Sequence, residues 1–194
     1  MTYQNNRVQA QYVSTGDPET VDDDPTKKSF VYGQLGNYVV IQQPGPRSEA
    51  GEGQDEEYRN KTYRYVKTDS TMTVAPYKGA VAWWADKSRF MVTTTVATTA
   101  RALRAGVFQF AVTKGHACFI QTGGPATVKF VDAVAGGNPY TTAGIPCIPS
   151  ATNGKADTDN VGVAPTYPAL GYSIGSGNAA ACTAIVDLAI PDTP

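Results

Sequence analysis

Turn-forming residues divide the second half of this 194-residue chain into short segments of β-branched and aromatic residues. Glycine, proline and asparagine recur at intervals of about ten residues, which is typical of a β-sandwich or a β-barrel. Within segments such as 106–112, apolar and polar residues alternate, and this period of two indicates strands. The segments expected to form strands are 106–112, 117–121, 126–131, 144–149, 161–163, 169–174 and 184–190. The expected turns are 114–115, 123–125, 136–139, 153–160 and 175–178.

The first half contains strand-like segments at 38–41, 63–65, 81–85 and 90–96. Tyr63-Arg64-Tyr65 alternates aromatic rings with a charge, which predicts a half-exposed strand. The stretches 83–89 and 97–104 are candidate helices, but both are too short to carry a helical fold. We therefore predict a mostly β chain, with a single antiparallel β-barrel or sandwich domain over residues 58–194.

Residues 1–57 differ in composition from the rest of the chain. Residues 1–28 are polar and poor in aliphatic side chains, with an acidic stretch at 17–25, and residues 43–57 are rich in proline, glycine and acids. Such segments bury too little apolar surface to offset the entropy of ordering them. We predict an extended N-terminal arm, interrupted by the strand at 38–41 and followed by a flexible loop or linker.

The charge balance excludes several classes of partner. Sixteen basic and seventeen acidic residues give a net charge of −1, which argues against sequence-independent binding to nucleic acid. No window approaches the roughly 18 consecutive apolar residues that a membrane span needs. The N-terminus lacks the apolar core of a secretory signal. We expect no nucleic-acid partner and no membrane partner.

The three cysteines form no recognisable metal or redox motif. Cys118, Cys147 and Cys182 lie far apart and among small or apolar neighbours, so we expect buried, reduced thiols made in a reducing cytosol. His116, the only histidine, would share a strand face with Cys118, and a Cys–His nucleophile pair is the one catalytic alternative. No orienting residue is recognisable beside it, so the chain is predicted not to be an enzyme.

Acidic turns offer the only candidate metal ligands. The carboxylates at 22–24 and the pair Asp157 and Asp159 could contact calcium, but the spaced glycine and closing glutamate of an EF-hand loop are missing. The glycine-rich turns match neither a phosphate-binding loop nor a dinucleotide fingerprint. We predict no metal and no cofactor.

Aromatic residues gather between positions 58 and 84. Tyrosine and tryptophan are enriched at protein interfaces, and an exposed cluster could also bind a glycan. The alternative is that these rings pack in the core or between subunits, because sheet faces accept aromatic side chains readily. The cluster comprises Tyr58, Tyr63, Tyr65, Tyr77, Trp83 and Trp84.

Three segments of the second half resemble a known family. Residues 104–128, which end in Gly-Pro-Ala-Thr-Val, are similar to the core of the small capsid decoration (cement) proteins of tailed phages, including cyanophages. Residues 144–157 resemble the family's PSAT-x-GKA segment, and residues 170–188 resemble its closing strands. The resemblance covers roughly residues 58–190, and the chain departs from the family pattern at Cys118 and Phe119, where an aromatic such as Trp is common.

The resemblance implies a compact β-barrel or β-tulip-like domain that binds the outside of the assembled head, between major capsid subunits, and stabilises the shell. It also implies a homotrimer and no catalytic residues. A glycan- or receptor-binding β-module of a phage tail or bacterial surface remains the alternative. The candidate capsid or intersubunit contacts are Tyr3, Tyr12, Phe30, Tyr32, Tyr58, Tyr63, Tyr65, Trp83 and Trp84.

Overall fold

The computed structural model of the chain describes residues 22, 35–41, 60–96, 103–159 and 167–191. In these residues the chain forms ten strands and one short 3₁₀ turn, η3 (Lys87–Arg89). The strands are β1 (Tyr38–Ile41), β2 (Lys61–Thr68), β3 (Val81–Asp86), β4 (Met91–Thr93), β5 (Arg104–Val107), β6 (Ala117–Lys129), β7 (Ala143–Pro149), β8 (Ala156–Thr158), β9 (Gly171–Asn178) and β10 (Thr183–Ala189). The described residues contain no helix of the length and apolarity needed to cross a membrane.

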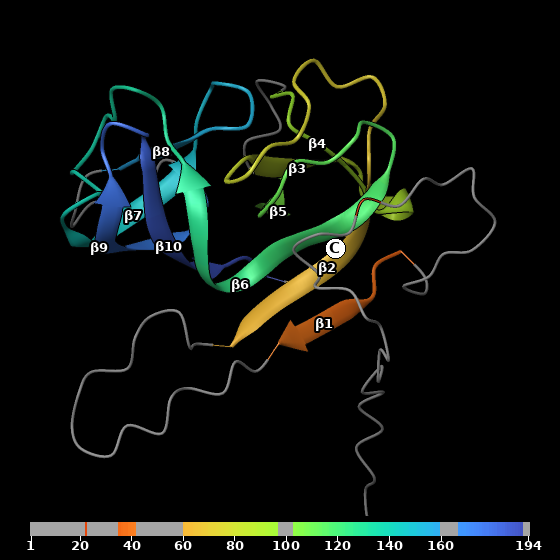
Figure 1. The fold of residues 1–194 in the computed structure, drawn as a ribbon, viewed down its shortest axis with the longest axis horizontal. Coiled ribbons are helices and arrows are strands. Elements are labelled where there is room, and N and C mark those ends of the chain that lie inside the picture. The colour runs from red at the N-terminus through yellow and green to blue at the C-terminus, as the bar shows by residue number, and fades with distance from the viewer. Residues whose placement is uncertain (1–21, 23–34, 42–59, 97–102, 160–166, 192–194) are drawn as a thin grey trace, which may run out of the picture.

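Five strands close into a barrel, which confirms the predicted fold class. Their order is β2-β4-β3-β5-β6, and β6 pairs back onto β2 to close the ring. All of these pairings are antiparallel except β2–β4, where Lys67 lies opposite Met91. The strand expected at 38–41 is also present as β1, and it pairs with β2 on the outside of the barrel (Figure 1).

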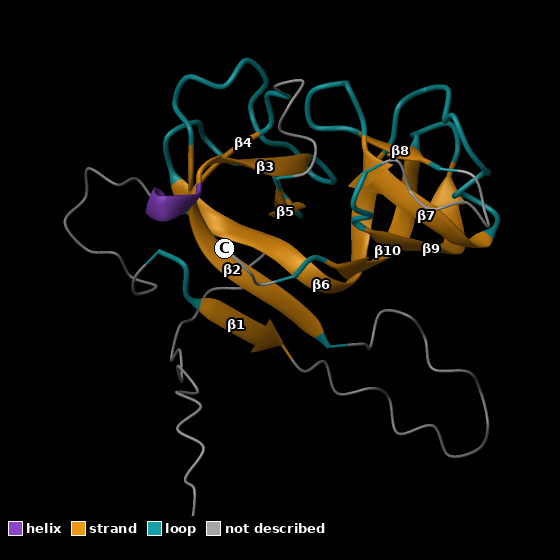
Figure 2. Cartoon of the chain, turned by 180° about the vertical axis from the view of Figure 1, so that it is seen from behind, coloured by secondary structure: helices purple, strands orange, loops and turns teal. Residues whose placement is uncertain are grey.

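The long strand β6 belongs to two groups of strands. Its first part pairs with β2 in the barrel, and its second part pairs with β10, which is followed across the sheet by β9, β7 and β8. This second group curls back toward the end of β6, where the N–H of Val131 donates to the carbonyl of Ala156 at 2.9 Å. Figure 2 shows the two groups side by side, with β6 running from one to the other.

The Gly123-Gly124-Pro125 segment, which we expected to be a turn, is a bend inside β6. Gly124 has a φ of +77°, a backbone conformation that glycine adopts at little cost. The buried amide of Gln121 donates from Nε2 to the carbonyls of Gly123 at 3.0 Å and of Pro125 at 2.9 Å. These bonds fix the bend, so the strand changes partners without leaving the sheet.

Other boundaries also differ from the predictions. The expected strand at 106–112 ends at Val107, while residues 156–158 and 175–178, predicted as turns, belong to β8 and β9. Most of the candidate helix at 83–89 is strand β3, and only Lys87–Arg89 turns. Pairing with distant strands decides these cases, and local composition does not carry that information. The expected strand at 161–163 and most of the candidate helix at 97–104 lie outside the described residues.

Three apolar clusters hold the fold together, and the alternation of β3 separates two of them. Trp84 points into the barrel, where it joins Val66, Cys118 and Ile120. Trp83, on the opposite face of β3, packs between the barrel and the second group of strands. The third cluster covers the outer face of β2 and β6 beneath β1, and its buried members are Tyr63, Tyr65, Ala117 and Phe119, with Leu35 and Val39 packed against them.

Candidate functional site

The predicted contact residues that the structure describes are buried in the chain's own core. Tyr63 and Trp83 are 1% and 0% exposed, and Tyr65 and Trp84 are also buried. The core alternative therefore holds for these four, and they do not form an exposed contact face as predicted. The physical reason is that β2 and β3 are covered on both faces, by the barrel interior on one side and by other strands on the other. The remaining candidates, Tyr3, Tyr12, Phe30, Tyr32 and Tyr58, lie outside the described residues.

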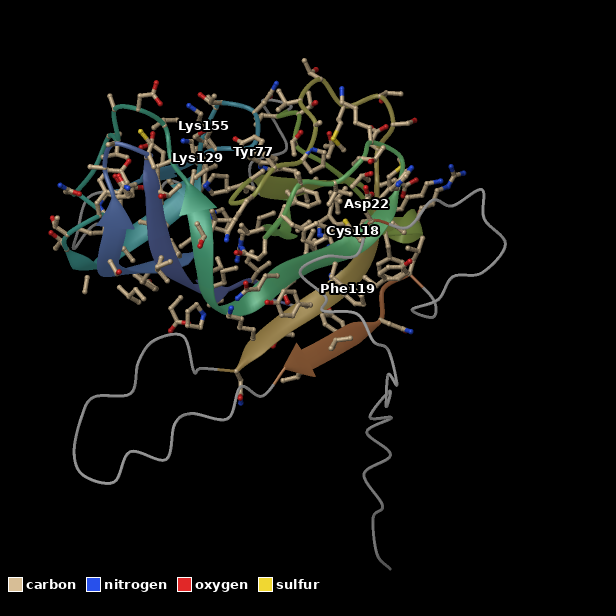
Figure 3. The ribbon with its side chains drawn as sticks, viewed as in Figure 1. Asp22, Tyr77, Cys118, Phe119, Lys129 and Lys155 are labelled. Atoms are coloured by element: carbon tan, nitrogen blue, oxygen red, sulfur yellow. The ribbon has the colours of Figure 1, made fainter. Side chains whose placement is uncertain are left out.

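His116 and Cys118 do not share an open strand face. β6 begins at Ala117, so His116 precedes the strand, whereas the Cys118 side chain is fully buried in the barrel interior. Figure 3 shows the position of Cys118 on β6. A thiol enclosed by apolar side chains is not presented to a substrate, so this pair offers no accessible nucleophile in the structure.

His116 instead contacts a residue of the predicted arm. Its Nδ1 lies 2.9 Å from Oδ1 of Asp22. The other carboxylate oxygen of Asp22 accepts a hydrogen bond from Oγ1 of Thr113 at 2.8 Å, and the N–H of Thr113 donates to Oδ1 at 3.2 Å. The acidic stretch at 17–25 thus has one member tied to the barrel by three polar contacts.

The cysteines differ in burial. Cys118 and Cys147 are free and buried, as predicted, but Cys182 is only half-buried, because it lies in the turn between β9 and β10. Burial raises the pKa of the Cys147 thiol to about 12. A neutral thiol is a poor nucleophile, so this cysteine acts as a small apolar side chain.

Alkylation by iodoacetamide at pH 8 should therefore modify Cys182 first in the folded chain. With a pKa of about 12 instead of 9, Cys147 has roughly a thousandfold less thiolate at that pH. Peptide mass spectrometry after timed quenching gives the three rates, and labelling in urea should make them similar. Raising the pH toward 12 should accelerate Cys147. Equal native-state rates for Cys147 and Cys182 would contradict the burial difference.

The candidate calcium ligands are occupied by the protein's own backbone or are too few. Oδ1 of Asp157 accepts hydrogen bonds from the N–H groups of Ala135 and Thr158, both at 2.8 Å. The described residues contain no group of three or more histidine, cysteine or acidic side chains that could hold a metal ion. Asp23 and Asp24 lie outside those residues. The Asp157 carboxylate is therefore engaged by backbone N–H groups within and beside β8.

A separate charged pair, Lys155 and Asp132, joins the residue before β8 to the loop after β6. Tyr77 and Lys155 are labelled in Figure 3, and the Tyr77 hydroxyl donates to the carbonyl of Gly154, the residue before Lys155, at 3.1 Å. Nζ of Lys155 lies 3.1 Å from Oδ1 of Asp132, and its hydrogen bond is the main cause that lowers the pKa of this aspartate. Asp132 is highly exposed, so the pair stabilises the fold little.

A pocket with a volume of about 360 Å³ lies where β1 meets the corner between β3 and β4. Its most unusual wall residue is Arg64, which is only 4% exposed although we expected it on a half-exposed strand. The Arg64 guanidinium carbon lies 4.3 Å from the centre of the Tyr38 ring and 5.4 Å from that of Trp84. The pocket is lined by Gly36, Tyr38, Arg64, Trp84, Lys87, Ser88 and Phe90.

Backbone geometry fixes the rim of this pocket. Phe90 has a φ of +50°, which is rare for an aromatic residue and marks a conformation imposed by its surroundings. Its ring is held edge-on to Trp84 at 6.3 Å and lies against Gly36, where a side chain would overlap it. Asp86 fixes the adjoining turn by accepting hydrogen bonds from the Ser88 hydroxyl at 2.7 Å and its N–H at 3.0 Å, and the hydroxyl bond is the main cause that lowers the pKa of Asp86.

The sequence did not identify this pocket. Trp84 was noted in the aromatic cluster, but Tyr38, Arg64 and Lys87 lie in three separate segments that only the pairing of β1 with β2 and the closure of the barrel bring together. No local pattern indicated the pocket, because the alternation of Tyr63-Arg64-Tyr65 predicted a half-exposed strand with Arg64 on its open face.

No protein-family model matches the chain, and no curated protein matches it at a significant level.

Proposed function

We propose that this chain is a structural protein of a tailed-phage virion, which binds the outer surface of the assembled head between major capsid subunits and stabilises the shell. The observation that supports the proposal is the resemblance to decoration proteins over residues 104–128, 144–157 and 170–188. These residues include β5 and β9 and most of β6, β7, β8 and β10. The resembling segments are thus neighbours in one continuous framework, which is what a shared fold requires.

The function would follow from binding equilibrium alone. A protein that binds only the assembled lattice stabilises that lattice by RT ln(1 + [L]/Kd), where [L] is the concentration of free protein. If the chain is a homotrimer, three linked contacts raise the effective affinity without any new interaction. The predicted arm would add contacts whose energy is partly offset by the entropy lost when it becomes ordered. No catalytic step, cofactor, nucleic acid or membrane is part of the proposal.

Labelling of purified virions with an antibody to this chain tests the proposal. We expect signal distributed over the head, and heads assembled without the chain should disrupt at a lower temperature and recover when purified chain is added. Signal confined to the tail tip would instead support the receptor-binding alternative. The buried positions of Tyr63, Tyr65, Trp83 and Trp84 do not favour that alternative, because it was based on an exposed aromatic cluster.

Deletion of residues 1–28 tests the role of the predicted arm. We expect the truncated chain to retain its barrel, because all five barrel strands lie after residue 60. We expect it to bind heads at least about tenfold more weakly if the arm supplies one or more charge-assisted contacts. The matched control is Asp22→Asn in the full chain, which keeps the arm but weakens its contact with His116 and Thr113. Full affinity of the truncated chain for heads would remove the arm from the binding mechanism.

A further inference from the structure

Strand β1 forms one edge of the sheet. Among the described residues it pairs only with β2, and Figures 1 and 2 show it as the outermost labelled strand on that side. The backbone N–H and C=O groups along an open edge can pair with a strand of a second chain. What this edge can accept depends on which of its groups point outward and on the side chains beside them.

The hydrogen bonds at the start of β1 fix which backbone groups point outward. The N–H of Tyr65 donates to the carbonyl of Asn37 at 2.8 Å, so Asn37 is bonded toward β2. In an antiparallel pair, residues bonded to the neighbouring strand alternate with residues whose backbone groups face away from it. Val39, two residues further along the same register, is therefore also bonded toward β2. The N–H and C=O groups of Tyr38 and Val40 then point away from the sheet.

The side chains along this edge carry no charge. Val40 is 56% exposed and Tyr38 is half-buried, and because they are two positions apart they lie on the same face of the strand. The sequence contains no charged residue from position 36 to position 43. Natural edge strands are commonly protected from pairing by a lysine or a proline, and β1 has neither. The edge is therefore open to a strand of similar, uncharged character.

This edge is complementary to a second copy of itself. When two copies of β1 meet antiparallel about a two-fold axis at Val39, Tyr38 of each copy lies opposite Val40 of the other. The outward N–H and C=O groups of both residues then exchange hydrogen bonds across the axis. Each exposed Val40 gains an aromatic ring beside it, and such cross-strand pairs stabilise antiparallel sheets. The lack of charge matters, because a two-fold axis brings like side chains together.

We propose that the free edge of β1 pairs with β1 of a second copy of this chain, so that the sheet continues from one copy into the other in a two-fold dimer. A contact through one short strand is small, and interfaces below about 1,200 Å² are typical of transient complexes. The dimer therefore forms and dissociates as the chain concentration changes. The inference is independent of the proposed function, because it concerns free copies of the chain and not their binding to heads.

Sedimentation velocity of the full chain, at concentrations up to about 1 mM, tests the pairing. We expect a monomer–dimer equilibrium. Val40→Pro should weaken it at least about tenfold, because proline removes the outward N–H of this residue in both copies, and with it half of the donors at the contact. The bonds from β1 to β2 do not use that N–H, so far-UV circular dichroism should be unchanged. Only monomer over the whole range, only trimer, or a dimer that Val40→Pro does not weaken would overturn the proposal.

Opposite charges at position 40 test the two-fold register. In the proposed pairing the two side chains at this position are diagonal neighbours on one face, about 7–8 Å apart. Val40→Lys and Val40→Glu should each weaken self-association at least about tenfold through like-charge repulsion and loss of the apolar contact. An equimolar mixture of the two variants should recover much of the dimer as a mixed pair, and this recovery should decrease at high salt.

Leu103→Lys is the matched control for these variants. Leu103 is an apolar residue that is 46% exposed, and it lies directly before β5 instead of on β1. The same charge there should leave the monomer–dimer equilibrium unchanged. If Val40→Pro fails to fold, the lysine and glutamate variants decide. A loss of association from Leu103→Lys as large as that from Val40→Lys would contradict the proposal, as would a mixture of the two position-40 variants that stays monomeric.

Discussion

Replacing Gly124 by alanine should destabilise the chain far more than the same replacement at Gly144. Both glycines have a φ of +77°, so each alanine would cost about 1–2 kcal/mol for a left-handed backbone. At Gly124 the new methyl group would also overlap the carbonyl oxygen of Asn60, which is backbone and cannot rotate away. This overlap should add about 1–3 kcal/mol. We therefore expect a loss of about 2–5 kcal/mol in the free energy of unfolding for Gly124→Ala.

Gly144 is a suitable control, because a methyl group added there would have no heavy atom of a non-adjacent residue within 4 Å. Gly144→Ala should lose only the backbone contribution of about 1–2 kcal/mol. Urea denaturation of the two variants and the unmodified chain measures both values on the same scale. Equal losses at the two positions would show that the close approach of β6 to the start of β2 is not needed for the bend.

The bend at Gly124 also shows how far the sequence could predict this fold. Alternation of apolar and polar residues correctly indicated a mostly β chain, and the strands at 38–41, 81–85 and 184–190 were found near their actual positions. A glycine pair followed by proline usually marks a reversal, so the sequence favoured a turn. Whether such a segment reverses the chain or bends a continuous strand depends on its partners, here Gln121 and the start of β2, which lie outside any local window.

The pocket could not be predicted from the sequence, because it too depends on pairing between distant strands. Trp83 and Trp84 were predicted together as one cluster, but strand alternation sends them to opposite faces, one into the junction between the two groups of strands and the other to the pocket wall. Tyr38 reaches Arg64 only because it lies opposite that residue in the β1–β2 register. Registers between strands joined by long connections depend on the whole fold, so the pocket became visible only with the structure.

Truncating Trp83, the tryptophan at the junction between the two groups of strands, should cause a large loss of stability. Its side chain is fully buried in the largest apolar cluster, together with Val107, Phe130 and Leu170. Trp83→Ala should lower the free energy of unfolding by about 3–5 kcal/mol, which combines lost burial with the cavity left behind. Urea denaturation followed by far-UV circular dichroism measures this loss without relying on tryptophan fluorescence.

Trp83→Phe separates packing from hydrogen bonding at the same position. The indole Nε1 of Trp83 is buried and has no hydrogen-bond partner among the described residues, so removing it relieves a desolvation cost of about 1–3 kcal/mol and offsets part of the lost volume. We expect a loss well below that of Trp83→Ala. Tyr172→Ala is the surface control, because Tyr172 is 51% exposed and should change stability by only about 0.5 kcal/mol. A Trp83→Ala loss close to that of Tyr172→Ala would mean that the two groups of strands do not depend on this ring for their contact.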